Sequence, residues 1–284
     1  MITKTRNRLK KSLKRIVKII RRPEMVILPG NISYALILSI FPSIMALTFI
    51  ISLFNVSPVD VLDFVSMNMP KDIYDLIYNF LDSSKSTGFA LLTFLIALFF
   101  SSNGTTSIIV AANVLYKTEE KNMFRRTVKS LLLVMLLMFL FAFTMFVLGF
   151  GSSILKTFID RLDGDYSIVY KIFTIIKWPI SFILIYFFIK ILYVISPSAK
   201  LKSKDVTKGA LFTTIGWVIA TYFYSIYVNE IAAYNVFYGS LSSIIVLMIW
   251  IYLLSNILVI GIAINAEDYL SNEGWIKPFL FTFY

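Results

Sequence analysis

Long runs of uncharged residues recur along the chain at a length that suits a membrane helix. The clearest run extends from Leu241 to Ala266 without a charged residue. An α-helix rises about 1.5 Å per residue and the hydrocarbon core is about 30 Å thick, so about 20 apolar residues cross it. The runs predict an all-α polytopic membrane protein, one membrane domain with six transmembrane helices, at residues 32–54, 88–116, 127–153, 171–196, 207–229 and 241–266.

Lys and Arg residues predict the orientation of these spans, because short cytoplasmic loops carry them in excess. They concentrate in the N-terminal arm at 1–30 and in the connections after the second and fourth spans, which hold Lys117, Lys121, Arg125, Arg126 and Lys129, and Lys200, Lys202, Lys204 and Lys208. The alternate connections hold few. The pattern predicts that the arm and the tail at 267–284, and thus both termini, are cytoplasmic.

The N-terminal arm has the pattern of an amphipathic interfacial helix. Apolar residues recur at helical spacing, with Lys and Arg on the other face: Leu9, Leu13, Ile16, Val17 and Ile20. Such a helix binds anionic lipid, so membrane lipids are the expected partners. The net charge of +11 could also indicate nucleic acid. Because the positive-inside rule already accounts for the basic residues, we expect no nucleic-acid binding.

The segment at 56–86, between the first two spans, is predicted to be a helical outer loop. Pro58 and Pro70 each suit the first turn of a helix. Apolar residues line one face of the second helix, so we expect it to lie along the outer leaflet or to cap the bundle.

Three stretches of the sequence are similar to one family. They are the Y-A-L-x-x-S-x-F-P pattern within 33–47, the N-x-x-Y exit of the second span at Asn113 and Tyr116, and the last span with its YGSL entry at 238–241, its Trp250 and Tyr252 pair and its N-A-E exit at 265–267. The chain resembles the YihY/BrkB family of bacterial inner-membrane proteins. The resemblance implies a multi-pass protein of a bacterial cell membrane and carries over no catalytic residue. Homologues were once labelled ribonucleases.

The composition argues against that ribonuclease label. The chain has no Cys and no His, which removes thiolate nucleophiles, imidazole bases and the commonest zinc ligands. Nuclease chemistry needs clustered carboxylates or a positioned acid and base, whereas the acidic residues are scattered in the predicted loops. We therefore expect no enzymatic activity, no metal and no cofactor. No Asp or Glu lies inside a predicted span, which argues against a proton relay.

Lys177 and Lys190 are charged residues in the interior of the fourth predicted span, which begins at Lys171. Both can extend their amines to a membrane surface. Lys177 is also the candidate contact for an anion or phosphate, because Pro179 frees backbone carbonyl groups beside it.

The second span is interrupted by a run of small or polar residues, Ser101 to Ser107. Two interpretations compete: close helix packing, and a broken helix that lines a polar cavity. If there is a substrate pathway, we expect it between the first, second and last spans. Its predicted lining is Ser39, Pro42, Ser43, Asn103, Gly104, Ser107 and Asn256.

The leading functional hypothesis is a transporter, exporter or lipid translocase for a polar or amphipathic solute. One alternative is a membrane enzyme that acts on lipid headgroups, and another is a structural or regulatory membrane protein without a substrate. A polar cavity beside 101–107 would favour transport, a carboxylate cluster at headgroup level would favour the enzyme, and a solid small-residue core would favour the structural role. The sequence does not indicate the substrate or the oligomeric state.

Overall fold

The computed structural model describes residues 15–52, 87–120, 122–145, 167–228 and 238–272. These ranges are helical and contain no strand, which confirms the all-α class. A short helical segment at 15–20 precedes the long helices. The main elements are α2 (Glu24–Ser52), α5 (Thr87–Tyr116), α6 (Met123–Met145), α8 (Ser167–Ile195), α9 (Thr207–Ile226), the 3-10 turn η3 (Gly239–Leu241) and α11 (Ser242–Asn272).

The observed helix bounds extend two of the predicted spans. α2 begins at Glu24, inside the range assigned to the arm, directly after Pro23. α11 continues to Asn272, inside the range assigned to the tail. The prolines at 29 and 42 lie inside α2 and do not end it. The predicted helices at 56–86, the end of the third span at 146–153 and the tail beyond 272 lie outside the described residues.

Four stretches of the described residues are long and apolar enough to cross a membrane. They are Phe94–Tyr116, Trp178–Ile195, Ser203–Ile226 and Ile244–Ser271. α2 contributes a shorter apolar stretch, Glu24–Ile40. Together with α6, these helices are compatible with six spans.

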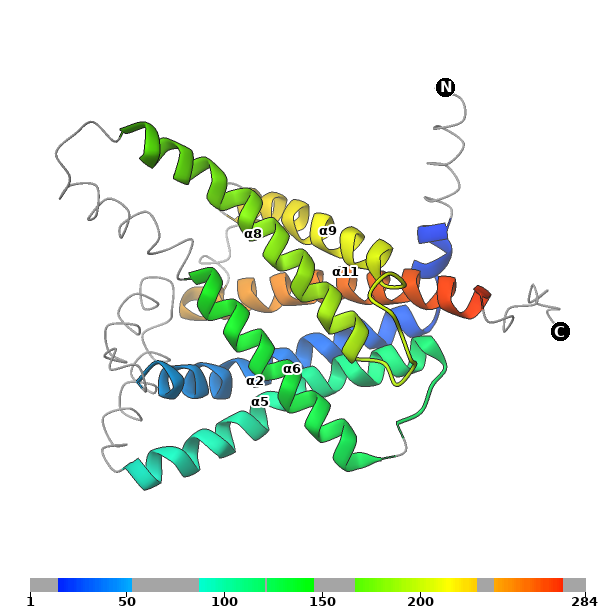
Figure 1. Ribbon diagram of the computed structural model, residues 1–284, viewed down its shortest axis with the longest axis horizontal. Coiled ribbons are helices and arrows are strands. Elements are labelled where there is room, and N and C mark those ends of the chain that lie inside the picture. Colours follow the sequence, from blue (N-terminus) through cyan, green and yellow to red (C-terminus); the bar gives the residue numbers. More distant parts are fainter. Residues whose placement is uncertain (1–14, 53–86, 121, 146–166, 229–237, 273–284) are drawn as a thin grey trace.

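Each long helix packs against the next one along the chain, and the last helix packs against the first. α2 packs against α5, α5 against α6, α6 against α8, α8 against α9, α9 against α11, and α11 against α2. α11 also contacts α5. Figure 1 shows α5 and α8 diverging toward one side, whereas the helices converge on the side where α11 ends.

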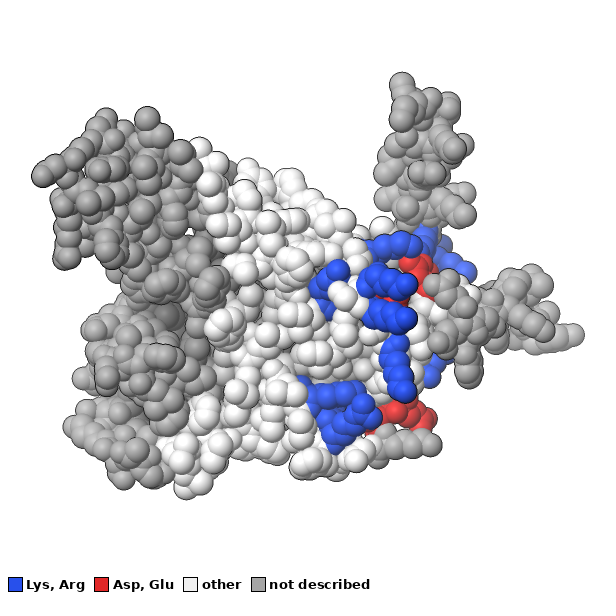
Figure 2. All heavy atoms as spheres, in the orientation of Figure 1, with Lys and Arg blue, Asp and Glu red and all other residues white. Residues whose placement is uncertain are grey.

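Charged residues gather where the helices converge. Figure 2 shows the Lys and Arg side chains at this end, beside an uncharged surface that covers most of the described helices. We call it the basic end and the opposite end the far end. The basic end holds the start of α2, the end of α5, the start of α6, the end of α8, the start of α9 and the end of α11. The described parts of the predicted basic stretches therefore share one end of the bundle, and the side of the membrane on which it lies stays a prediction.

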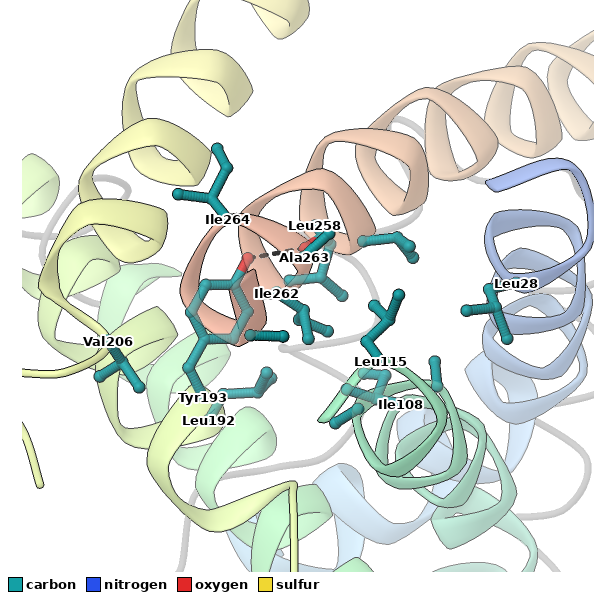
Figure 3. Packing of buried hydrophobic residues seen from close by; sticks show 14 of the residues in the cluster. Leu28, Ile108, Leu115, Leu192, Tyr193, Val206, Leu258, Ile262, Ala263 and Ile264 are labelled. Atoms are coloured by element: carbon teal, nitrogen blue, oxygen red, sulfur yellow. Dashed lines mark hydrogen bonds between the residues drawn. The ribbon is translucent and has the colours of Figure 1, made fainter. Parts of the chain in front are cut away.

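The largest hydrophobic cluster lies toward the basic end. It contains residues of α2, α5, α8, α9 and α11, among them Leu28, Ile108, Leu192 and Ile262, together with Val206 directly before α9 (Figure 3). A smaller cluster joins α2, α5 and α6 through Ala46, Ala97, Leu98, Val134 and Met138. The core that positions the helices is therefore unevenly distributed along the bundle.

Candidate functional site

α11 divides into two halves that differ in burial. From residue 255 to 266 every side chain is buried or half-buried. In the far half, residues 242–254, the consecutive residues Leu247, Met248 and Ile249 are 38%, 43% and 38% exposed. Consecutive helical residues point about 100° apart. The exposure therefore covers more than one face of the far half.

One face of α11 is buried in the core at the basic end and exposed at the far end. Leu258 and Ile262 belong to the core cluster and are each 2% exposed. Leu247 lies eleven residues before Leu258, and Met248 lies fourteen residues before Ile262, so each pair points in nearly the same direction. The face of α11 that is buried at Leu258 is thus exposed at Leu247.

Glycines bring α9 and α11 close together in the basic half. A Cβ atom added to Gly209 would overlap the backbone oxygen of Gly261, and one added to Gly261 would overlap the hydroxyls of Thr213 and Tyr193. This is the close approach that small residues permit between membrane helices. Gly209 and Thr213 of α9 and Gly261 of α11 all take part in this packing.

Buried hydrogen bonds accompany this approach. The Tyr193 hydroxyl donates to the Leu258 carbonyl oxygen at 2.8 Å and lies 2.6 Å from the Thr213 hydroxyl. Figure 3 shows Tyr193 reaching from α8 to α11. The Gly209 amide donates to the Asn265 side-chain oxygen at 2.8 Å. α8, α9 and α11 are thus joined by neutral polar contacts inside the apolar core.

Two buried polar atoms on α11 have no hydrogen-bond partner among the described residues. They are the Ser255 hydroxyl and the Asn265 side-chain nitrogen, on residues that are 2% and 1% exposed. Ser255 lies seven residues after Met248 and seven before Ile262, so it shares their face. An unpaired hydroxyl therefore lies where the exposed part of this face meets the core.

Longer side chains join the far half of α11 to α9. The Tyr224 hydroxyl donates to the Val246 carbonyl oxygen at 2.7 Å, and the Trp217 indole donates to the Leu254 carbonyl oxygen at 3.0 Å. Bulky aromatic side chains bridge the helices here, whereas backbones meet at Gly209 and Gly261. The far half is accordingly more open.

Ion pairs fasten the segment before α2 to the end of α11. Arg15 pairs with Glu267 and Asp268, each at 2.7 Å, and Arg22 pairs with Glu267. Lys208, at the start of α9, pairs with Asp268 at 2.8 Å. In the same segment Ile19 is fully buried, while Val17 and Ile20 are about half exposed. The described end of the arm thus packs on the bundle, and its binding to anionic lipid stays a prediction.

The two other basic connections are also joined at the basic end. The Ser198 amide donates to the Asn113 side-chain oxygen at 2.7 Å. The Ser198 hydroxyl and the Lys129 amine donate to Glu120, at 2.8 and 2.7 Å. The Glu120 side chain is 7% exposed. The hydrogen bond from Lys129 lowers the pKa of Glu120 below the ordinary glutamate value, so this carboxylate is charged at neutral pH.

The polar run of α5 is largely used in helix packing. The Ser130 hydroxyl of α6 donates to the Ser102 carbonyl oxygen at 2.6 Å, and the Thr106 hydroxyl donates to the Ser130 hydroxyl at 2.8 Å. On the other flank the Gly104 amide donates to the Ser39 hydroxyl of α2 at 2.9 Å. α5 is helical through this run, so the interpretation as a broken helix is wrong. Hydroxyl groups here satisfy backbone atoms of the same or neighbouring helices and leave the helical bonds intact.

The structure places the predicted pathway residues in different surroundings. Of the set, the structure brings Ser39 and Gly104 together. Asn103 is exposed on the outward side of α5, and the Asn256 amide donates to the Tyr252 carbonyl oxygen of its own helix at 2.7 Å. Asn256 points away from Leu258, two positions further on. Pro42, Ser43 and Ser107 are half-buried, while Lys177 lies in α8 and its side chain is outside the described part.

Several residues of this arrangement were not singled out from the sequence. Ser130, Tyr193, Ser198 and Glu120 each make contacts between helices or connections that are far apart in the chain. In the sequence, Ser130 and Tyr193 are hydroxyl residues within apolar spans, which is a weak signal for a contact between helices.

Comparison with known families identifies the chain. The family model described as "Virulence factor BrkB" matches residues 20–273. The chain belongs to the BrkB family. The ribonuclease-like protein YfkH of Bacillus subtilis is 30% identical over 247 residues, which cover 84% of this chain and 87% of the relative. A UPF0761 membrane protein of Vibrio atlanticus is 24% identical, covering 84% of this chain and 75% of the relative. No solved structure matches the chain.

Membership of the BrkB family makes this a membrane protein and fits the apolar helices. The ribonuclease-like name belongs to the relative from Bacillus subtilis. Within the described ranges, no three or more His, Cys, Asp or Glu side chains are placed to hold a metal ion. The interior face of α11, which is exposed in its far half, is the candidate functional site of this BrkB-family chain.

Proposed function

We propose that this BrkB-family protein moves a lipid or another amphipathic solute across the membrane, and that the solute enters along the interior face of the far half of α11. The observation that carries the proposal is the exposure of Leu247 and Met248 on a face that is buried at Leu258 and Ile262. A protein whose only role was structural would gain from filling this interior along its whole length, because packing holds membrane helices together.

The chemistry of this face favours an amphipathic solute. Its exposed side chains, Leu247 and Met248, are apolar and suit an acyl chain. The unpaired Ser255 hydroxyl at the boundary with the core can hydrogen-bond a neutral polar group. The stretch Ile244–Ala266 holds no Asp or Glu, so a bare cation would find no countercharge there. The anion contact predicted for Lys177 remains part of the proposal, as a site for a phosphate.

Movement past the core requires the basic half to open. Inside the core, the contacts that close it are a glycine approach and neutral hydrogen bonds of Tyr193, Thr213 and Asn265. Each neutral hydrogen bond contributes only about 1 kcal/mol, so these core contacts separate at modest cost. The ion pair of Lys208 with Asp268, at the start of α9 and the end of α11, would open with them. These polar groups would bond to one another when the bundle is closed and to a headgroup when it is open. This exchange would lower the free energy needed for opening.

The proposal is tested by lipid movement in vesicles that contain the purified protein and a phosphatidylcholine with a fluorescent label. The chain has no cysteine, so Met248→Cys gives a single reactive site. A bulky, water-soluble maleimide should react there and stop most of the protein-dependent lipid movement. Ile183→Cys, on a half-exposed residue of α8, is the matched control and should keep its activity after reaction.

Two results would contradict the proposal. One is lipid movement no faster than in vesicles without protein. The other is full activity after complete reaction of Met248→Cys, because a solute that passed along this face would then meet an obstacle.

A further inference from the structure

Asn103 is a polar residue at the centre of the outward face of α5. Helical spacing places Leu92, Ile96, Phe99 and Phe100 on the same face, and these four are between 49% and 56% exposed. The flanks of the helix are occupied, because Gly104 contacts α2 and Thr106 contacts Ser130 of α6. The opposite face carries Ala112, which is fully buried in the core cluster. Asn103 therefore points away from the bundle.

The surroundings of Asn103 do not satisfy its amide. The residue lies near the middle of the apolar stretch Phe94–Tyr116, where a hydrocarbon environment offers neither donors nor acceptors. Among the described residues Asn103 has no hydrogen-bond partner, whereas the outward Asn256 donates to Tyr252 of its own helix. Polar side chains in membrane helices bond across to neighbouring helices. The unpaired amide on this apolar face thus indicates a partner helix.

The partner that fits is a second copy of the chain. The distribution of Lys and Arg gives every copy the same direction in the membrane (Figure 2). A twofold axis along the membrane normal then places equivalent residues of two copies at the same depth. An amide carries both a donor and an acceptor, so two Asn103 side chains that face each other can bond reciprocally. The large apolar side chains around them supply the packing surface.

We propose that the protein forms a parallel homodimer through the outward face of α5, with Asn103 paired to Asn103 of the second copy. This interface lies on a different face of the bundle from the interior side of α11. It does not depend on the proposed transport.

Cysteine cross-linking in membranes tests the geometry, since the chain has no cysteine of its own. Ile96→Cys, Asn103→Cys and Val110→Cys lie seven residues apart on the outward face and should give a covalent dimer on oxidation. Leu132→Cys, on an exposed position of α6 at 56%, is the control and should stay monomeric. Equal cross-linking at Leu132, or none along α5, would overturn the proposal.

Dimer affinity tests the role of the amide. Energy transfer between labelled copies in vesicles gives the dissociation constant as the protein is diluted with lipid. Asn103→Leu should weaken the dimer about tenfold, Asn103→Gln should weaken it less, and Asn256→Leu should leave it unchanged. An unchanged dissociation constant for Asn103→Leu, or a protein that is monomeric at every dilution, would contradict the assignment.

Discussion

The two halves of α11 are both apolar, but they contact the neighbouring helices in different ways. The basic half is joined to α8 and α9 by backbone approach at Gly209 and Gly261 and by the Tyr193 hydroxyl. The far half is bridged to α9 by aromatic side chains and leaves Leu247 and Met248 accessible. Both halves are apolar, so their difference lies in how closely the backbones approach.

That difference has a physical origin in the membrane. Lipid tails are as apolar as leucine, so burying a leucine between helices gains little from water exclusion and depends on packing contacts. Small residues supply those contacts by letting backbones meet, and residues such as Trp217 and Tyr224 prevent it. A bundle can thus be closed at one end and open at the other without any change in average hydropathy.

The largest effect on stability is expected when a leucine is replaced by alanine, once in each half of α11. Leu258→Ala should reduce the free energy of unfolding by about 3 kcal/mol, because the 2% exposed side chain leaves a cavity in the core. Leu247→Ala, on nearly the same face and 38% exposed, should cost under about 0.5 kcal/mol. Denaturant unfolding of both variants in the same detergent provides the measurement. Equal losses would show that the far half is packed as firmly as the basic half.

A smaller effect is expected at the glycine contact. Gly209→Ala should destabilise the protein by about 2 kcal/mol, because the added Cβ atom meets the backbone oxygen of Gly261 and α9 must move away. Gly30→Ala is the matched control, since a Cβ atom there meets nothing within 4 Å. Alanine favours the helix, so the control should be neutral or stabilised by up to about 1 kcal/mol. Thermal unfolding in detergent compares the two, and an unaffected Gly209→Ala would mean that this contact does not hold the basic half together.

Sequence reasoning predicted the elements of this fold well. The second predicted span, 88–116, corresponds to α5 at Thr87–Tyr116, and the fifth begins at Thr207 as predicted. The gathering of the basic stretches at one end also followed from the sequence. These properties depend on the length of apolar runs and on loop charge, which are local features that single sequences carry.

The orientation of each helix about its axis could not be predicted in the same way. In a soluble helix, polar residues mark the outward face, whereas a membrane helix is apolar on its lipid and core faces alike. The run at Ser101 to Ser107 therefore did not reveal which residues point inward. The structure directs Ser102 and Thr105 to α6, Gly104 to α2 and Asn103 outward. Pairings such as Ser130 with Ser102 depend on which helices are neighbours, and no local pattern encodes that.

The smallest expected effect concerns the buried carboxylate that joins two basic connections. Glu120→Gln should lower stability at neutral pH by about 1.5 kcal/mol, because it removes the charge from the bonds with Lys129 and Ser198. Since the pKa of Glu120 is lowered in the folded protein, its contribution is complete above the ordinary glutamate pKa of about 4.3 and is lost as the pH falls below that value. Unfolding of the two proteins at pH 7 and at pH 3.5 should therefore differ more at pH 7. Glu119→Gln, an exposed neighbour, is the control and should match the unchanged protein at both pH values. The contrary result is a difference in the free energy of unfolding that is the same at pH 7 and at pH 3.5. The lost contact would then be steric, and the charge of Glu120 would not help to close the basic end.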